Sequence, residues 1–194
     1  MSTSNNVISN YGPIKSISMP DGFTKTAYDP GEFVNRSTTT FCLSSDSSVE
    51  VSLMFRGVPV SEKAASAFQQ ILDTVINSER DLSGDEIISL EEVLGIPGKN
   101  QYTVRTLMGK KATPPFNLTA AKAMRVKGRQ AICVWGNFQD DGRQPINEYY
   151  GVFLDATRNP SLVFELFYLA SDKMKFFYHL NDFETAIETI EWAD

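Results

Sequence analysis

The chain has 194 residues, of which 42% are hydrophobic and 22% charged, and its formal net charge is −6. This composition is typical of a soluble globular protein and excludes wholesale disorder. No apolar run reaches the roughly 20 residues that a membrane-spanning helix needs. The first residues contain neither a basic nor an apolar segment, so the sequence predicts no secretory signal.

The N-terminal part of the chain predicts strands joined by short turns. Residues 1–12 are polar and predict a flexible N-terminus in front of one domain over residues 13–194. Residues 14–19 alternate as a strand does, and the composition of residues 20–23 indicates a turn.

A β-hairpin is predicted next. The Thr-rich residues 36–43 favour a strand, and residues 44–48 form its turn. The second strand carries the clearest period-two pattern of the chain, with apolar positions Val49, Val51, Leu53 and Phe55.

Two helices follow in the predicted order. Ser61 is placed to cap the first helix, whose apolar positions are Ala65, Phe68, Leu72 and Val75. The second helix is shorter. It begins at Ser83, where Glu86 completes a capping box, and it ends at Gly95.

The remaining sequence predicts more strands and a final helix. Residues 102–108 favour a strand, residues 110–119 a loop, and residues 120–126 either a strand or a helix. Residues 130–139, 148–155 and 162–170 predict three adjacent antiparallel strands. Residues 182–192 predict a helix packed over them through Phe183, Ala186, Ile187 and Ile190. The fold class is therefore α+β, a twisted antiparallel sheet sandwiched between helices in α/β/α layers.

Two segments resemble a known fold family. Val126-Lys-Gly-Arg-Gln-Ala131 precedes a long strand, two further strands and a closing helix, and Met19-Pro-Asp-Gly-Phe23 ends an early strand. This layout, over about residues 14–192, resembles the Mog1/PsbP-like fold. The resemblance implies a partner-binding module and transfers no functional residue.

Conventional catalytic and metal motifs are not apparent in the sequence. His179 is the single histidine, in a crowded apolar setting that favours a structural role. Cys42 and Cys133 lack metal-ligand spacing, and we expect two buried free thiols in a reducing compartment, with a single disulfide as the alternative. The cytoplasm is the expected location, and no cofactor is predicted.

Residues 81–92 resemble an EF-hand calcium loop. Asp81, Ser83, Asp85 and Glu92 occupy ligand positions, but Glu86 stands where the loop needs glycine for its sharp turn. A calcium-responsive protein is kept as one alternative, while a capped helix explains the same residues without a metal.

A second alternative is a small-ligand-binding protein or an enzyme. Glu165 is the charged residue inside an apolar strand, and burial would raise the pKa of its carboxyl. Trp135, Tyr149 and Tyr168 are its candidate neighbours in a pocket. A rim glutamate that is hydrogen-bonded to a tyrosine remains the simpler interpretation.

The favoured function is a non-enzymatic protein-interaction module, such as an adaptor, a chaperone-like protein or an inhibitor. Three successive aromatic residues, Phe176, Phe177 and Tyr178, lie in a segment predicted to connect a strand to the last helix, so at least one ring should be exposed. Lys173 and Lys175 would form a polar rim that attracts an acidic protein.

Charge is segregated along the chain, which also bears on the partner. The middle segment contains no acidic residue between Lys99 and Gln139, and its basic residues are Lys99, Arg105, Lys110, Lys111, Lys122, Arg125, Lys127 and Arg129. They are not interleaved with stacking aromatics, so the sequence does not favour nucleic acid as the partner. We expect these cations to face solvent or the protein's own acidic segments.

Overall fold

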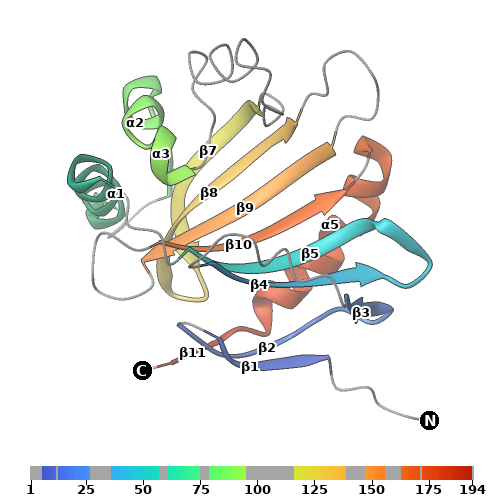
Figure 1. The fold of residues 1–194 in the computed structure, drawn as a ribbon. Coiled ribbons are helices and arrows are strands. Elements are labelled where there is room, and N and C mark those ends of the chain that lie inside the picture. The colour runs from blue at the N-terminus through green and yellow to red at the C-terminus, as the bar shows by residue number, and fades with distance from the viewer. Residues whose placement is uncertain are drawn as a thin grey trace.

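The computed structural model describes residues 6–11, 13–26, 36–56, 61–74, 79–94, 116–138, 147–155, 163–170 and 172–193. The protein is mixed α+β, and the strands of these residues form two antiparallel sheets (Figure 1). The helices are α1 (Glu62–Thr74), α2 (Gly84–Ser89), α3 (Glu91–Leu94) and α5 (Lys173–Glu188). None of these helices is long and apolar enough to cross a membrane.

Within the described residues, the large sheet has eight strands and the small sheet three. The large sheet contains, in spatial order, β3 (Phe23–Lys25), β4 (Arg36–Leu43), β5 (Asp46–Arg56), β10 (Val163–Ala170), β9 (Asn147–Asp155), β8 (Arg129–Phe138), β7 (Phe116–Val126) and β6 (Arg80–Asp81). The small sheet contains β1 (Val7–Tyr11), β2 (Ile14–Ser18) and β11 (Glu191–Trp192).

The three predicted C-terminal strands are confirmed as β8, β9 and β10. They are adjacent and antiparallel, with Trp135 opposite Tyr150 and Tyr150 opposite Tyr168. On its other edge β10 pairs with β5, where Leu166 lies opposite Leu53. One strand therefore joins the N-terminal β4–β5 hairpin to the C-terminal strands.

The β7–β8 hairpin turns on two residues with left-handed backbone angles. Lys127 has φ +49° and Gly128 has φ +81°, and Val126 pairs with Arg129 across the turn. Positive φ at both turn positions matches the twist of the flanking strands, which is the type I′ arrangement. Residues 120–126 are therefore a strand, as one of the two predicted alternatives has it. Strand β7 begins at Phe116, so the loop predicted over residues 110–119 is wrong for its last four residues.

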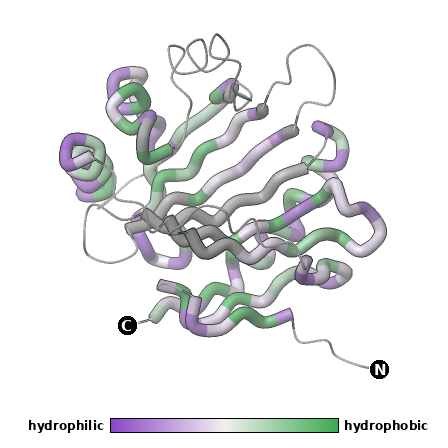
Figure 2. Tube along the Cα trace, in the orientation of Figure 1, coloured by the Kyte–Doolittle hydropathy of each residue, from purple (hydrophilic) through white to green (hydrophobic). Residues whose placement is uncertain are grey.

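The large sheet is covered on both faces, and alternate residues of β8 serve the two sides. Ala131 and Cys133 belong to one core cluster, which includes Phe176, Phe183 and Ile187 of α5. Ile132 and Val134 belong to the other, which includes side chains of α1, α2–α3 and β7. This alternation follows from the two-residue period of a strand. Hydrophilic and hydrophobic positions mix within α1 and α2, as expected of helices with one buried side (Figure 2).

The predicted bounds of the last helix are wrong. Helix α5 begins at Lys173, because the carboxylate of Asp172 caps it and accepts a hydrogen bond from the Lys175 amide at 2.9 Å. It ends at Glu188, and Trp192 belongs to strand β11, which pairs with β2. The supposed connector is therefore the first half of the helix.

The flexible segment expected over residues 1–12 contains an ordered strand, while residues 1–5 and 12 lie outside the described residues. Val7–Tyr11 forms β1, which pairs with β2. The hydroxyl of Tyr11 donates a hydrogen bond to the carbonyl of Leu53 at 2.9 Å, which ties the small sheet to the large one. A polar strand can be ordered because its backbone groups are paired and one side chain reaches the core.

Among the other predicted elements, the turn expected over residues 44–48 is shorter than predicted, because β5 begins at Asp46. Strand β4 has the predicted bounds, and Ser61 caps α1 through a bond of 3.2 Å from the Ala64 amide. The second predicted helix is divided at Leu90 into α2 and α3. Val75, Gly95 and the strand expected over residues 102–108 lie outside the described residues.

We predict that truncating the inner side of α5 destabilises the protein. Phe183 is 1% exposed, so Phe183→Ala should lower the free energy of unfolding by about 3–5 kcal/mol, and Ile187→Ala by about 2–4 kcal/mol. Met174→Ala, on the outer side of the same helix, should cost less than about 0.5 kcal/mol. Urea denaturation measures all three. Losses below about 0.5 kcal/mol at both inner positions would mean that the helix is not docked.

Candidate functional site

The outer face of α5 carries an apolar cluster that the protein does not cover. Met174, Phe177 and Tyr178 are 81%, 59% and 81% exposed, whereas Phe176 is 4% exposed. Positions spaced three and four residues apart share one face of a helix, so these three side chains are neighbours. Helix α5 is therefore apolar on two sides over its first turns. We call Met174, Phe177 and Tyr178 the outer cluster.

Exposure of at least one of the three successive rings was expected, and two of them, Phe177 and Tyr178, are exposed. The reason differs from the predicted one. A helix advances about 100° per residue, so three successive side chains point in three directions and only Phe176 reaches the core. A sequence signal for this cluster exists. With Asp172 as the helix cap, the helical spacing of Met174, Phe177 and Tyr178 places them on one face.

The two lysines of the predicted polar rim have different roles. Lys175 lies 2.7 Å from the Asp46 carboxylate and 3.8 Å from that of Asp172, and it donates to the Ser48 hydroxyl at 2.9 Å. It fastens the first turn of α5 to the β4–β5 hairpin and does not belong to the rim. Lys173 is exposed, and its ammonium lies 5.8 Å from the centre of the Phe177 ring.

The contact with Lys175 also changes the pKa of Asp46. Hydrogen bonds from Lys175, and then from Ser48, lower the pKa of Asp46 to about 2, and Asp46 raises the pKa of Lys175. Both groups therefore stay charged through the physiological range. This contact holds the first turn of α5, which carries Met174 of the outer cluster and precedes Phe177 and Tyr178.

An open groove of about 390 Å³ runs beside the second half of α5. Tyr150, Val126 and Ile187 are among its apolar lining residues, and its polar lining has both signs of charge. Lys127 and Glu188, one from each wall, lie 3.6 Å apart. The groove is thus bridged by the protein's own charges, which favours a solvated channel beside the helix over a dedicated ligand site.

Two of the four residues of the pocket predicted around Glu165, Trp135 and Tyr149, lie on opposite faces of the sheet. Trp135 packs against the core on the α5 side of the sheet, whereas Tyr149 belongs to the core on the α1 side. Trp135 stacks on Tyr150, at 4.6 Å between ring centres. The side chains of Glu165 and Tyr168 lie outside the described residues.

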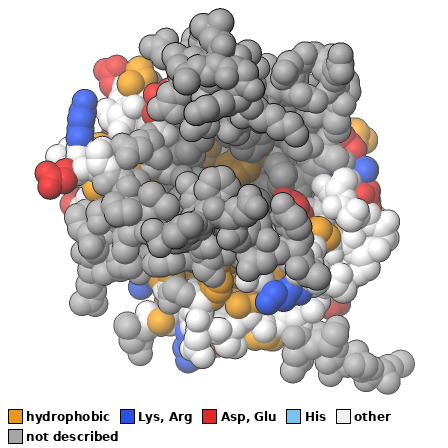
Figure 3. Space-filling view, viewed as in Figure 1, with side chains coloured by type: hydrophobic (Ala, Val, Ile, Leu, Met, Phe, Trp, Pro, Cys, Tyr) orange, Lys and Arg blue, Asp and Glu red, His pale blue; other side chains and the backbone are white. Residues whose placement is uncertain are grey.

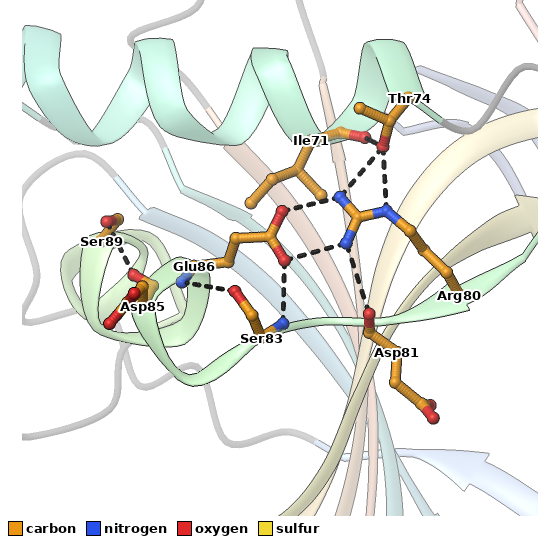
Figure 4. Close-up of polar contacts among 8 residues, drawn as sticks. All are labelled: Ile71, Thr74, Arg80, Asp81, Ser83, Asp85, Glu86 and Ser89. Carbon is orange, nitrogen blue, oxygen red and sulfur yellow. Dashed lines mark hydrogen bonds and ion pairs between the residues drawn. The ribbon is translucent and has the colours of Figure 1, made fainter.

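The stretch that resembles an EF-hand is a capped helix. Ser83 and Glu86 satisfy each other's backbone amides in the capping box, as predicted, and Gly84–Ser89 is helical. Figure 4 shows the Arg80 guanidinium between the Glu86 carboxylate, at 2.7 Å, and the hydroxyl of Thr74, at 3.1 Å. Glu86, which a calcium loop would replace with glycine, is thus the centre of a network that joins α1, β6 and α2. The alternative calcium loop of Asp81, Ser83, Asp85 and Glu92 would need an irregular backbone over residues that are helical in the structure.

The histidine and the two cysteines, which are candidate nucleophiles or bases by residue type, all lie in the described part of the chain. His179 is half-buried and lies 2.9 Å from the Asp182 carboxylate. Cys42 and Cys133 are free thiols, and Cys133 is buried while Cys42 is half-buried. Burial raises the pKa of Cys133 to about 12, so the thiol stays protonated at neutral pH and is a poor nucleophile.

The basic middle segment partly faces the protein's own acids. Lys122 lies 3.9 Å from Asp81, and Lys127 pairs with Glu188. Lys99, Arg105, Lys110 and Lys111 lie outside the described residues. Over α1 and α2, charged side chains of both signs lie close together, at the left of Figure 3. In the described residues, neither observation indicates a basic stripe for nucleic acid.

Calcium provides a direct test of the capped helix. Millimolar calcium should leave the melting temperature unchanged, because the backbone over residues 84–89 is helical and Glu86 is already engaged by Arg80. Differential scanning fluorimetry with calcium or with magnesium measures this. A calcium-specific rise that Glu92→Gln abolishes would contradict the prediction.

The Arg80–Glu86 contact predicts a particular pH dependence of stability. Hydrogen bonding to Arg80 lowers the pKa of Glu86 from 4.5 to about 2, so the ionised form stabilises the fold above about pH 4.5 and this contribution is lost as the pH falls toward 2. Glu86→Gln should therefore cost about 1–2 kcal/mol at pH 7 and progressively less below pH 4.5. Denaturant titrations at several pH values measure the difference.

The neighbouring exposed residue supplies the control for this experiment. Asp85→Asn should change the free energy of unfolding by less than about 0.5 kcal/mol across the same pH range. A cost of Glu86→Gln that stays constant from pH 7 to pH 3 would show that the carboxylate charge is not what Arg80 stabilises.

Comparisons with known proteins do not assign a family. Neither the protein-family models nor the curated proteins contain a match to this chain. Among solved structures, the chain is similar to the crystal structure of PA94, a protein of unknown function from Pseudomonas aeruginosa, with a TM-score of 0.42 and 16% identity over 89% of this chain and 98% of that one.

Proposed function

We propose that this chain is a non-enzymatic, cytoplasmic protein-interaction module that binds a partner protein through the outer face of α5. The observation that carries the proposal is the exposure of Met174, Phe177 and Tyr178 side by side on an ordered helix. Aromatic residues and methionine are enriched in the cores of protein interfaces, and Tyr is frequent among the residues that contribute most to binding.

The attachment of α5 supports the same proposal. Its first turn is fixed by the contact between Lys175 and Asp46, and its inner side is buried through Phe176 and Phe183. A cluster on such a helix is preorganised, so binding loses little conformational entropy in ordering it. Lys173 lies at the edge of the cluster and provides a polar boundary.

We also propose that the arrangement is a Mog1/PsbP-like sandwich. The contacts of α5 with one core cluster, and of α1 to α3 with the other, support helices on both faces of the sheet. The early strand β2 followed by the turn at Asp21 and Gly22 matches the segment on which the resemblance rests. A fold of this kind is consistent with partner binding but does not identify the partner.

Partner capture from a native lysate tests the proposal. The immobilised protein should retain at least one protein, identified by mass spectrometry, that Phe177→Ser and Tyr178→Ser lose by about tenfold or more. Both variants should melt within about 2 °C of the parent protein, because the altered side chains are exposed.

Ile88→Ser is the matched control, since Ile88 is 68% exposed on α2, in a different part of the fold. It should retain the same proteins as the parent chain. Equal capture by all four proteins, at equal melting temperature, would refute binding through the outer face of α5.

A further inference from the structure

We infer that the outer face of α5 binds a second copy of this chain, with the two α5 helices antiparallel about a two-fold axis near Tyr178. This inference rests on the proposed function and names its partner. A second copy fits this face because the charges of the face are complementary to themselves after a two-fold rotation.

The complementarity arises from the positions of two opposite charges along the helix. Lys173 and Glu184 are both exposed and are eleven residues apart, which is about three helical turns. They therefore lie on the same flank of α5, one near each end of the exposed stretch. A two-fold axis that makes two helices antiparallel brings the same flank of each helix together. Lys173 of each copy then lies opposite Glu184 of the other.

The apolar residues match in the same arrangement. With the axis at the level of Tyr178, the rings of Phe177 and Tyr178 from both copies meet at the centre of the interface. Met174 lies one turn earlier and falls against the level of Asn181 and Thr185, two exposed, uncharged residues at the rim of the groove beside α5. No charge is placed against the aromatic centre, so the pairing avoids burying an unpaired ion.

The two charges that this pairing uses are not held in ion pairs within the described part of the protein, unlike two of their neighbours on α5. Lys175 is bound to Asp46, and Glu188 is paired with Lys127. Among the described residues, neither Lys173 nor Glu184 takes part in an ion pair within 4.0 Å. The outer face therefore retains one cation and one anion at the spacing that an antiparallel copy requires.

The available area predicts a weak and reversible dimer. A large side chain carries roughly 150–250 Å² of surface, so the outer cluster offers on the order of 400 Å² per copy. This is about half of the roughly 800 Å² per partner that a standard specific interface buries, and it falls in the range of weak, transient contacts. We therefore expect a dissociation constant on the order of 10–100 µM.

Sedimentation equilibrium of the full chain measures this constant. Tyr178→Ser should weaken dimerisation by about tenfold or more, and the control Ile88→Ser should leave it unchanged. A chain that remains monomeric up to about 1 mM would overturn the inference, and so would a dimer that Tyr178→Ser does not weaken.

A charge exchange tests the antiparallel geometry itself. Lys173→Glu alone and Glu184→Lys alone should each weaken self-association by about three- to tenfold, because each places like charges together at both ends of the interface. Mixing the two single variants places opposite charges together at both ends, so dimers should form with about the affinity of the parent chain. The double variant should also dimerise like the parent. A mixture no tighter than either variant alone would overturn the inference.

The outcomes separate this inference from the proposed function. A monomeric chain that still loses a captured protein on Tyr178→Ser would overturn self-pairing and leave a different partner on the same face. A dimer that the mixed charge variants restore would identify the second copy as the occupant.

Discussion

The fold depends on the pairing of β10 with strands on both of its edges. β10 lies between β9, its neighbour along the chain, and β5, which comes from the N-terminal hairpin. Backbone groups on both edges are thereby satisfied, and the sheet becomes continuous from β3 to β6. A pairing between such distant segments requires a large loss of chain entropy, which apolar side chains buried on both faces of the joined sheet offset.

The joined sheet also determines where α5 packs and how firmly it is held. The helix follows β10 with little intervening chain, so its inner side covers the face formed by residues such as Cys133, Tyr150 and Val51. Its first turn is bound to the β4–β5 hairpin through Lys175, on the opposite side of β10 from β9. Because both segments hold the helix, its outer cluster lies on a rigid support, and the partner that we propose would not have to order a loop in order to bind.

The second face of the sheet is organised by a polar network. Arg80 contacts Glu86, and Glu86 closes the capping box at Ser83, so a single carboxylate links a short edge strand to a short helix. Very short helices gain little stability from their own backbone bonds and depend on capping and on packing. The carboxylate oxygens of Glu86 accept hydrogen bonds from Arg80 and from the Ser83 amide, and these bonds stabilise a helix where a calcium loop would need a sharp turn.

Much of the local structure follows from the sequence, because it depends on neighbouring residues. The capping box at Ser83, the β4–β5 hairpin and the three C-terminal strands were all predictable from turn residues and periodicity. Exposure among the three successive aromatic residues was also predictable, since no regular element buries three adjacent side chains on one side.

Tertiary structure decided the features that depend on distant partners. The start of α5 at Lys173 is stabilised by the cap of Asp172 and by Asp46, which lies far away in the sequence, and the ordering of β1 depends on Leu53. The candidate pocket was divided because Trp135 and Tyr149 point to opposite faces, which strand register alone determines. The sequence by itself determined which residues favour strands, turns and caps. Only the folded chain decided which apolar side chains of α5 are buried and which remain exposed, because burial depends on the neighbours that pack against each face.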